Sequence, residues 1–355
     1  MESFRDTNGS KTKFSLPTPT LVNQRNNNES EVTTKELPLQ VNQALLRPTE
    51  LDEFVGQDRV KRTLGMLIRA SQIENAPLPH ILMQGPAGHG KTTLSLIAAS
   101  MTQAGMIQVL GPQVNESNEL TRPLLMERDS AWCVFFIDEV HRLKVKFQET
   151  LYPVMEDFKI HEISRYGQAS QRSIKPFALI GATTNPGALA KPFRDRFQLT
   201  LRLEPYTLDE MSELVQRSAK RLSVEVEEEA EIMIAKRCRN SPRQANNILA
   251  FCRRVALVHE SSINKEVVDD ATQNLGIDEL GLTHDDRFYL ETLSEKFDGG
   301  PTGIKSISAA SDLDEENISG TIEPHLLEKQ LIDRTPKGRK ITSEGILHIA
   351  THLNF

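Results

Sequence analysis

The segment Gly85–Thr92 has the residue types and spacing of a loop that holds the phosphates of a nucleoside triphosphate. Its glycines let successive backbone N–H groups curl around a β-phosphate, Lys91 adds positive charge beside the β- and γ-phosphates, and the Thr92 hydroxyl can ligate Mg²⁺. The residues that we expect to contact the nucleotide here are Gly85, Pro86, Ala87, Gly88, His89, Gly90, Lys91, Thr92 and Thr93. The pattern indicates binding of ATP with Mg²⁺.

Two carboxylates follow an apolar run that is typical of a buried strand. In Val134–Glu139, four apolar residues precede Asp138 and Glu139. Asp138 would hold the hydration shell of Mg²⁺, and Glu139 would polarise the water that attacks the γ-phosphate. An isolated Asp-Glu pair is more often an acidic strand end facing solvent. The phosphate loop about 46 residues upstream favours hydrolysis instead, because ATPases use a spacing of that order.

Further polar residues are candidates for the same site. Thr183 and Thr184 follow a third apolar run and could sense the γ-phosphate or hold the attacking water. Arg194 and Arg196 stand next to a bulky aromatic residue and could equally be a solvated surface pair. Arg243, in the first turn of a helix, could reach a phosphate in a cleft between two domains or cap a neighbouring helix.

Apolar periodicity predicts the elements that would position these residues. His80–Gln84 is a predicted buried strand that enters the phosphate loop, and Thr92–Ala99 is a predicted helix that leaves it with its N-terminus toward the phosphates. Cys133–Ile137 and Phe177–Ile180 are further strand candidates among helical segments. This alternation predicts an α/β domain around a mainly parallel sheet.

Strand signals vanish after Tyr206, and two capping patterns mark helices. Thr207 with Glu210 forms a capping box, and Ser241 precedes a proline at a first helical position. Farther on, a helix over 285–297 and a hairpin around the turn Thr335–Gly338 predict a winged helix. The predicted domains are a disordered polar extension (1–43), a large ATPase domain (44–205), a helical lid (206–277) and a winged helix (278–355).

Composition sets broad limits on the class of protein. A chain of 355 residues exceeds one ordinary hydrophobic core, so two or three domains are expected. Cys133, Cys238 and Cys252 are too few and too far apart for a zinc site or a disulfide framework, which indicates core thiols in a reducing compartment. No run is long enough to span a membrane and no secretory signal is present, so we expect a cytoplasmic protein.

A cationic cluster surrounds the predicted hairpin turn. Arg334, Lys337, Arg339 and Lys340 would make a compact tip suited to phosphate contacts without sequence readout. Four charges on a ribbon are more often only a solvated hairpin. The formal net charge of −7 is a weak argument against nucleic acid, since a local patch suffices.

With these elements in this order, the chain resembles AAA+ ATPases and, more narrowly, the RuvB family of Holliday-junction branch-migration motors. The resemblance covers about Leu46 to Thr342. The segments that carry it are Arg47–Gln57, Asp138–Leu143, Leu151–Phe158, Gly181–Phe197, Gly299–Gly303 and Arg334–Arg339. Clamp loaders and other AAA+ relatives share the first two of these in general character and lack the last two.

The resemblance implies roles for individual residues. It places Arg196 as the arginine finger that reaches into the next subunit's ATP site, a group that can supply a factor of about 10³ to 10⁵ in hydrolysis. Arg243 matches the lid-domain sensor, and Arg334 and Arg339 match DNA-contacting positions. The adenine pocket and a further nucleotide-binding stretch would be formed by Leu46, Arg47, Phe54, Val55, Tyr206, Glu156, Asp157 and Phe158.

The chain also departs from the family pattern. Ala87 and His89 replace the usual proline and leucine, which should not abolish ATP binding because backbone N–H groups form the cradle. About four residues are missing near Arg172–Phe177 from the apolar hairpin that docks the junction-binding protein RuvA, so that contact should be weaker or altered. In the winged helix, Glu315 occupies a position where the family usually has a DNA-contacting arginine. Gln330 replaces a helix-ending glycine, and Gly320 lies within the expected recognition helix.

The function that the sequence favours is a DNA-dependent ATPase that assembles as a homomeric ring, expected to be a hexamer, around duplex DNA. It would couple ATP hydrolysis to Holliday-junction migration in recombination and repair. Two alternatives stay open at this point. One is a clamp-loader-like ATPase of replication maintenance, and the other is an ATP-regulated DNA-binding protein without motor activity.

Overall fold

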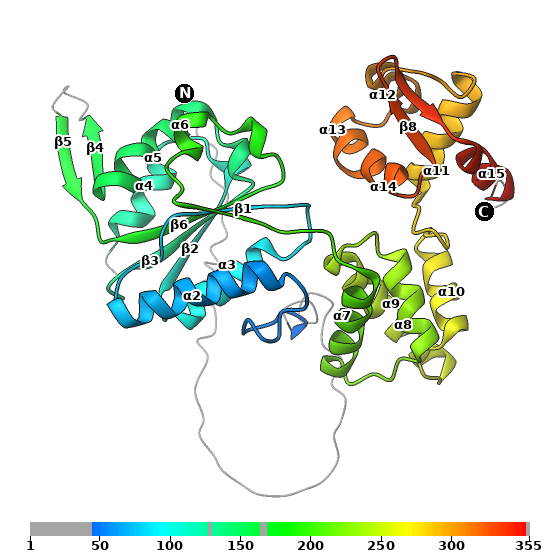
Figure 1. Cartoon of the computed structure of the whole chain (residues 1–355), viewed down its shortest axis with the longest axis horizontal. Coiled ribbons are helices and arrows are strands. Elements are labelled where there is room, and N and C mark those ends of the chain that lie inside the picture. Colours follow the sequence, from blue (N-terminus) through cyan, green and yellow to red (C-terminus); the bar gives the residue numbers. More distant parts are fainter. Residues whose placement is uncertain (1–44, 127–129, 164–168, 353–355) are drawn as a thin grey trace, which may run out of the picture. The chain divides into compact units, whose positions relative to one another are not determined.

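The computed structural model describes residues 45–126, 130–163 and 169–352, and the predicted polar extension lies outside these ranges. A sheet of five parallel strands in the order β2-β3-β6-β1-β7 organises the first part of the described chain (Figure 1). The strands are β1 (Ile81–Gln84), β2 (Gly105–Leu110), β3 (Cys133–Asp138), β6 (Phe177–Thr183) and β7 (Leu199–Arg202). The predicted parallel α/β fold is confirmed.

The packing of β3 on both faces explains why its sequence is almost entirely apolar. Val134 and Phe136 pack into a core on the side of α2 and α3, whereas Phe135 and Ile137 pack into a second core on the side of α4 and α5 (Figure 1). A strand buried on both faces needs apolar side chains at every position. The helical segments of this domain are α2 (Asp58–Glu74), α3 (Lys91–Met101), η1 (Gly111–Gln113), α4 (Asn118–Leu125), η2 (Val140–Arg142), α5 (Val145–Asp157), η3 (Pro186–Ala188) and α6 (Lys191–Arg194).

The register of the sheet brings the predicted chemical groups to one edge. Gln84, the last residue of β1, pairs with Thr183 on β6, and Asp138 ends β3 on the other side of β6. Ligands of open parallel sheets bind outside the carboxyl ends of the strands. Gly85 begins the phosphate loop at this edge.

A separate antiparallel hairpin extends from the same domain. It is formed by β4 (Lys159–Ile163) and β5 (Ala169–Ser173), and residues 164–168 lie outside the described ranges. The backbone N–H of Ile174 donates to the carbonyl of Phe158 at the base. The segment near Arg172–Phe177, which the sequence suggested to be shortened, therefore contains the end of the returning strand. The sequence analysis did not assign these two strands.

Four helices form the next domain around an apolar core of their own. Thr207 Oγ1 accepts from the N–H of Glu210 at 3.2 Å while Glu210 accepts from the N–H of Thr207 at 2.8 Å, which confirms the predicted capping box. Ser241 caps its helix as expected by accepting from Gln244. The helices are α7 (Leu208–Arg221), α8 (Glu228–Arg237), α9 (Pro242–His259) and α10 (Lys265–Asn274). Among the described helices, none is long and apolar enough to cross a membrane.

All three cysteines are buried and free, which agrees with their predicted role as core thiols. Cys133 belongs to the core of the large domain, and Cys238 and Cys252 belong to the helical core. Burial raises the pKa of both Cys238 and Cys252 to about 12, so these two thiols stay protonated and weakly reactive near neutral pH.

The last domain departs in detail from the predicted helices. The helix expected over 285–297 is confirmed, but it is an α-helix only to Glu291 and continues to Lys296 as a π-helix, which the sequence did not indicate. Gly320, expected within a recognition helix, lies in a second π-helix, where an extra residue per turn loosens the regular α-helical packing. The segments are α11 (His284–Glu291), η4 (Thr292–Lys296), α12 (Ile304–Ser311), α13 (Glu315–Asn317), η5 (Ile318–Ile322), α14 (Glu323–Glu328), β8 (Ile332–Thr335), β9 (Gly338–Ile341) and α15 (Ser343–His352).

The predicted β-hairpin is confirmed, and the Gly299–Gly303 segment supports it. Thr302 exchanges two backbone hydrogen bonds with Arg339, at 2.8 and 2.9 Å, and so pairs with β9. Gly338 has φ 133, and a Cβ there would collide with the Thr302 carbonyl. Glycine is therefore needed where the two backbones approach each other.

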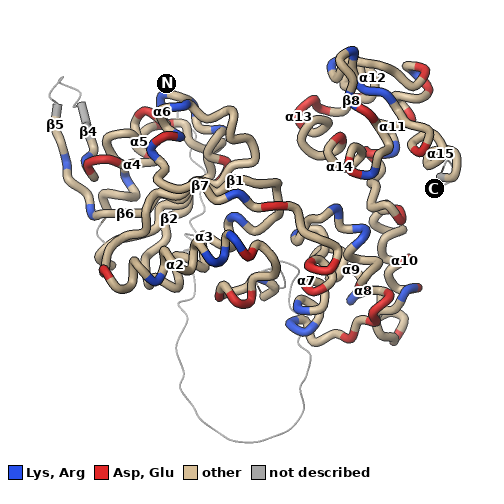
Figure 2. Tube along the Cα trace, in the orientation of Figure 1, with Lys and Arg blue, Asp and Glu red and all other residues tan. Residues whose placement is uncertain are grey.

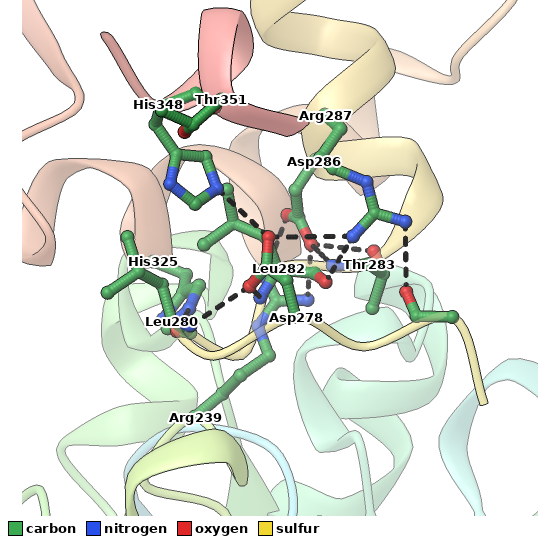
Figure 3. Close-up of polar contacts among 11 residues, drawn as sticks. Arg239, Asp278, Leu280, Leu282, Thr283, Asp286, Arg287, His325, His348 and Thr351 are labelled. Atoms are coloured by element: carbon green, nitrogen blue, oxygen red, sulfur yellow. Dashed lines mark hydrogen bonds and ion pairs between the residues drawn. The ribbon is translucent and has the colours of Figure 1, made fainter. Parts of the chain in front are cut away.

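A buried polar network surrounds the entry into the last domain (Figure 3). Asp278 accepts from the backbone N–H groups of Leu280 and Leu282 at 3.0 and 2.8 Å, and it lies 2.9 Å from His348 Nε2 and 3.5 Å from Arg287 Nη1. Burial alone would raise the pKa of Asp278, but the contact with His348 and the N–H of Leu282 hold that pKa below its ordinary value.

A second buried carboxylate in the network ties two segments together. Asp286, fully buried on α11, receives both Nη groups of Arg239 at 3.0 and 3.1 Å (Figure 3). Burial raises the pKa of Asp286, while Arg239 opposes the shift. Arg239 also donates to the carbonyl of Thr321 at 2.8 Å. The segment ahead of α9 is thereby joined to α11 and η5 by charged contacts.

Candidate functional site

The phosphate loop links β1 to α3, and Lys91 is the first residue of that helix. Lys91 is only 6% exposed, and its Nζ donates to the carbonyls of Gly85 and Pro86 at 2.8 Å each. Burial lowers the pKa of Lys91, with Glu139 and Asp138 opposing that shift. Gly90 has φ 94, and a Cβ there would lie 2.6 Å from the Phe54 ring. The loop is thus a glycine-dependent cradle with a cation inside it.

Two oxygen groups meet beside this cradle. Thr92 Oγ1 donates to Asp138 Oδ2 at 3.3 Å, and the other carboxylate oxygen accepts from the N–H of Glu139 at 3.0 Å. Mg²⁺ prefers oxygen ligands and is usually held by one or two protein groups together with water and substrate phosphates. Thr92 and Asp138 have the chemistry and the proximity that such a site needs.

The carboxylate of Glu139 is held by neighbouring polar groups. Its backbone has φ 49, a left-handed conformation that is costly for a non-glycine residue and recurs at functional sites. Thr184 Oγ1 donates to Glu139 Oε2 at 3.2 Å, and His141 Nδ1 lies 3.2 Å from that same oxygen and 3.0 Å from Thr183 Oγ1. Burial lowers the pKa of His141 despite the nearby Glu139. These contacts fix the orientation of a candidate general base.

A cavity of about 410 Å³ lies against the loop, which is within the range of small-ligand sites. Most of the residues that the sequence analysis assigned to a nucleotide line it. They are Leu46, Arg47, Phe54, Val55, Ala87, Gly88, Gly90, Lys91, Thr92, Thr93, Asp138, Glu139, Tyr206 and Arg243. Eight further assigned residues do not line the cavity: Gly85, Pro86, His89, Thr183, Thr184, Glu156, Asp157 and Phe158.

His89 has a different position from its loop neighbours. It is buried, its ring lies 5.7 Å from the ring of Tyr206, and its carbonyl accepts from the Tyr206 hydroxyl at 3.4 Å. Burial raises the pKa of Tyr206 above its ordinary range and lowers the pKa of His89. His89 therefore supports a wall of the cavity through Tyr206.

The sequence analysis missed one wall of the cavity, which one face of α7 provides. This face consists of Leu214, Arg217, Ser218 and Arg221, which are spaced at three, four and seven residues. That spacing was the available signal, because residues so spaced share a helix face. Arg221 donates to the carbonyl of Leu46 at 2.8 Å and pairs with Glu53 at 3.0 Å, so it anchors two residues of the N-terminal segment that also lines the cavity.

The predicted arginine finger does not line the cavity. Arg196 Nη1 donates to the Pro192 carbonyl at 2.7 Å, its Nε lies 3.1 Å from Glu156 Oε1, and its guanidinium lies over the Tyr152 ring at 4.1 Å. Glu156 is on the last turn of α5, so the structure brings the predicted finger together with the Glu156–Phe158 stretch. These residues form a group separate from the residues around Lys91.

The four cations of the hairpin are divided between two faces. Arg334 pairs with Arg339 across the ribbon, whereas Lys340 pairs with Asp333. Side chains on successive residues of a strand point to opposite faces, so the arginines share one face and Lys340 lies on the other. Lys337 belongs to the turn. The compact tip expected from sequence is therefore a pair of arginines with two separate lysines.

Exposed acidic residues lie on α13. Glu315 and Glu316 are both exposed, and this helix appears red in Figure 2. Carboxylates repel a phosphate backbone, so α13 is an unfavourable element for contact with nucleic acid.

Comparison with known families accounts for nearly all of the described chain. A model of the P-loop domain of the Holliday junction DNA helicase RuvB matches residues 46–203, a RuvB AAA lid model matches 206–278, and a RuvB C-terminal winged helix model matches 279–350. The chain belongs to the RuvB family. The helices and ribbon after residue 279 therefore form a RuvB-type winged helix.

Individual members of the RuvB family are similar along almost their whole length. The RuvB subunit of the Holliday junction branch migration complex from Kosmotoga olearia is 39% identical over 328 residues, which cover 90% of this chain and 94% of that protein. The solved structure of the RuvB Holliday junction branch migration motor from Thermotoga maritima superposes with a TM-score of 0.77 at 37% identity. That match covers 86% of this chain and 98% of the other.

Proposed function

We propose that this chain is an ATP-driven motor that moves duplex DNA to drive branch migration at Holliday junctions in recombination and repair. The observation that carries the proposal is a single cavity, in a RuvB-family chain, that joins the phosphate loop to Asp138, Glu139 and Arg243. A protein that only bound ATP would need no general base at this position.

The geometry supports distinct roles in hydrolysis. Lys91 and the loop N–H groups would hold phosphates, and Thr92 and Asp138 would hold Mg²⁺, which would neutralise charge on the phosphates. Glu139, oriented by Thr184 and His141, takes a proton from the attacking water. Arg243 adds positive charge from the first turn of α9.

Arg196 is proposed to act on a neighbouring subunit. Its position beside Tyr152 and Glu156, away from the cavity lining, suits a finger that enters the next subunit's site. We propose that the subunits assemble as a homomeric ring, expected to be a hexamer, and that activity depends on this assembly. Asp157 and Phe158 would lie at the same junction between subunits.

The partners in this proposal are DNA and a RuvA-type protein. Arg334 and Arg339, with Lys337 and Lys340, would contact the phosphate backbone of duplex or four-way junction DNA. The hairpin of β4 and β5 would dock the RuvA-type partner, more weakly if it is shortened. We propose that the protein works in the cytoplasm. The clamp-loader and binding-only alternatives are not favoured, because the lid and winged helix models of RuvB match the rest of the chain.

The proposal is tested by ATP turnover and junction migration for the wild type and for Glu139→Gln. We expect the substitution to lower turnover by at least about 10²-fold, because it removes the general base, while nucleotide affinity stays close to wild type. Rates would be measured with and without four-way junction DNA, each with and without a RuvA-type protein. Unchanged turnover in the variant would remove the role assigned to Glu139.

Subunit mixing tests the shared site. Glu139→Gln subunits lack the base but keep the finger, and Arg196→Ala subunits lack the finger but keep the base. Each variant alone should be inactive, and a mixture should regain turnover at junctions where an intact finger meets an intact base. A mixture that stays inactive, although the two variants assemble together, would show that Arg196 acts within its own subunit.

A further inference from the structure

A buried carboxylate lies beneath the arginine pair of the winged helix. Glu323, the first residue of α14, is fully buried and receives hydrogen bonds from both arginines. Arg334 donates from Nε and Nη2 to Oε2 at 3.0 and 2.6 Å. Arg339 donates from Nε to Oε1 at 2.7 Å and from Nη2 to Oε2 at 3.2 Å. One carboxylate therefore fixes two guanidinium groups.

Tyr289 is the third residue whose side chain donates to the Glu323 carboxylate. Its hydroxyl donates to Glu323 Oε1 at 3.2 Å, and the tyrosine is fully buried. The Glu323 carboxylate thus accepts five hydrogen bonds from side chains on α11, β8 and β9. A buried charge is tolerated when it is paired and its lone pairs are satisfied in this way.

The arginines remain available on their outer sides. Arg334 is 49% exposed and Arg339 is 21% exposed in their side chains, although both are paired. Across the part of the chain that the structure describes, the Nη1 group of neither arginine has a hydrogen-bond partner. Planar guanidinium groups bind phosphate oxygens through paired N–H donors, so a fixed plane with free N–H groups is a prepared phosphate receptor.

On charge alone, Glu323 would be expected to weaken the binding of DNA. Two arginines and one carboxylate leave a single net positive charge, and like charges directly opposite each other on a ribbon repel. A purely electrostatic patch would bind a polyanion better without the carboxylate. We propose that Glu323 is a positioning residue that orients Arg334 and Arg339 toward successive contacts with the DNA phosphate backbone. Its contribution to DNA affinity is then favourable, against the sign of its charge.

The inference rests on the proposed function, because it requires that the wild-type chain binds duplex DNA through these arginines. The test measures the affinity of the full chain for a duplex at several salt concentrations. Glu323→Gln removes the negative charge beside the two arginines, and Glu323→Asp keeps that charge but shortens the side chain by one methylene. Both should weaken binding about tenfold, whereas Tyr289→Phe, which leaves both arginine pairings intact, should stay within about twofold of wild type.

A double-substitution cycle shows whether Glu323 acts through the arginines. In a chain with Arg334→Gln and Arg339→Gln, the further change Glu323→Gln should alter affinity less than twofold. Lys337→Ala is the matched control, because it removes a cation of the same hairpin that has no bond to Glu323. Its effect on the free energy of DNA binding should add to that of Glu323→Gln without coupling. ATP turnover without DNA and the melting temperature show that each variant is folded.

The outcomes separate the two proposals. Tighter or unchanged binding by Glu323→Gln, with Glu323→Asp also unchanged, would overturn the positioning role while leaving DNA binding intact. If Glu323→Gln does not fold, Glu323→Asp and the cycle built on it decide the question alone. If the chain with Arg334→Gln and Arg339→Gln binds DNA as tightly as the wild type, the proposed DNA-binding surface is wrong.

Discussion

Arg196 must be presented at a fixed angle if it is to reach a phosphate held by another subunit. The Tyr152 ring beneath its guanidinium and the Glu156 carboxylate beside its Nε supply that support. Tyr152 also lies near the buried Phe193, with ring centroids 6.1 Å apart, so it is itself anchored. Cation–π contacts of this kind contribute about 0.5 to 2 kcal/mol.

We predict that Tyr152→Leu lowers ATP turnover about tenfold, since the finger loses its aromatic support, while the KM for ATP changes little. Tyr152→Phe keeps the ring and should stay near wild type. Mixing Tyr152→Leu with Glu139→Gln subunits should restore turnover, as for Arg196→Ala. Loss of nucleotide binding in Tyr152→Leu would instead point to a general structural role for the tyrosine.

The candidate site was predictable where its residues are adjacent in sequence. Lys91, Thr92, Asp138 and Glu139 stand in short motifs whose spacing reflects strand, loop and helix, and the structure brings them to one sheet edge. Glu323 was not predictable, because its role depends on Arg334 and Arg339 folding over it from 11 and 16 residues away. A lone glutamate at a helix start carries no signal of that pairing.

At the scale of elements, the chain after α14 contains an unusual residue. Gln330 has φ 57, although left-handed backbone after a helix is usually provided by glycine. The conformation costs a residue with a Cβ about 1 to 2 kcal/mol. The side chain of Gln330 is exposed, so nothing buried depends on it.

We predict that Gln330→Gly stabilises the winged helix by about 1 kcal/mol, because glycine adopts this backbone without steric cost. The melting transition of that domain should rise by about 4 °C or more. Gln330→Ala serves as the control, since alanine keeps a Cβ at the same φ and should give no such gain. Equal melting temperatures for the glycine and alanine variants would contradict the explanation from backbone strain.

Helices and strands were predicted best where the sequence carried one clear pattern of residue types. The central strands are continuous apolar runs, and the capping box at Thr207 announced its helix. The hairpin of β4 and β5 was missed because Ala169–Ser173 is a polar segment without apolar alternation. The two π-helices were also missed, since the extra residue in each turn leaves no distinct pattern of residue types.

For the whole molecule, buried histidines make stability depend on pH. His325 is 5% exposed, and burial together with the positive charge of Arg239 lowers its pKa to about 4 from 6.5, with Asp278 opposing weakly. The folded state therefore keeps His325 neutral at pH values where the unfolded chain already binds a proton. The contribution of His325 to folding stability is fully present above about pH 6.5 and is lost as the pH drops toward 4.

We predict that His325→Gln loses less stability than the wild type between pH 7 and pH 5. Glutamine keeps an N–H donor for the Leu280 carbonyl, which His325 Nε2 contacts at 3.1 Å, but it cannot take up a proton. The difference should be of the order of 2 kcal/mol over this interval. His284→Gln, at the exposed first residue of α11, is the control and should follow the wild type. Parallel pH profiles for His325→Gln and the wild type would refute the assignment.

The apolar residues of the described chain are divided among cores that share no buried residue: two beside the sheet, one in the lid and one in the winged helix. The cavity takes its walls from the sheet domain and the lid and from no residue of the last core. A ligand stabilises only what it binds. In a heating experiment, ATP should therefore raise the melting temperature of the first two domains and leave that of the winged helix unchanged. The winged-helix transition then serves as an internal reference against which nucleotide occupancy can be measured.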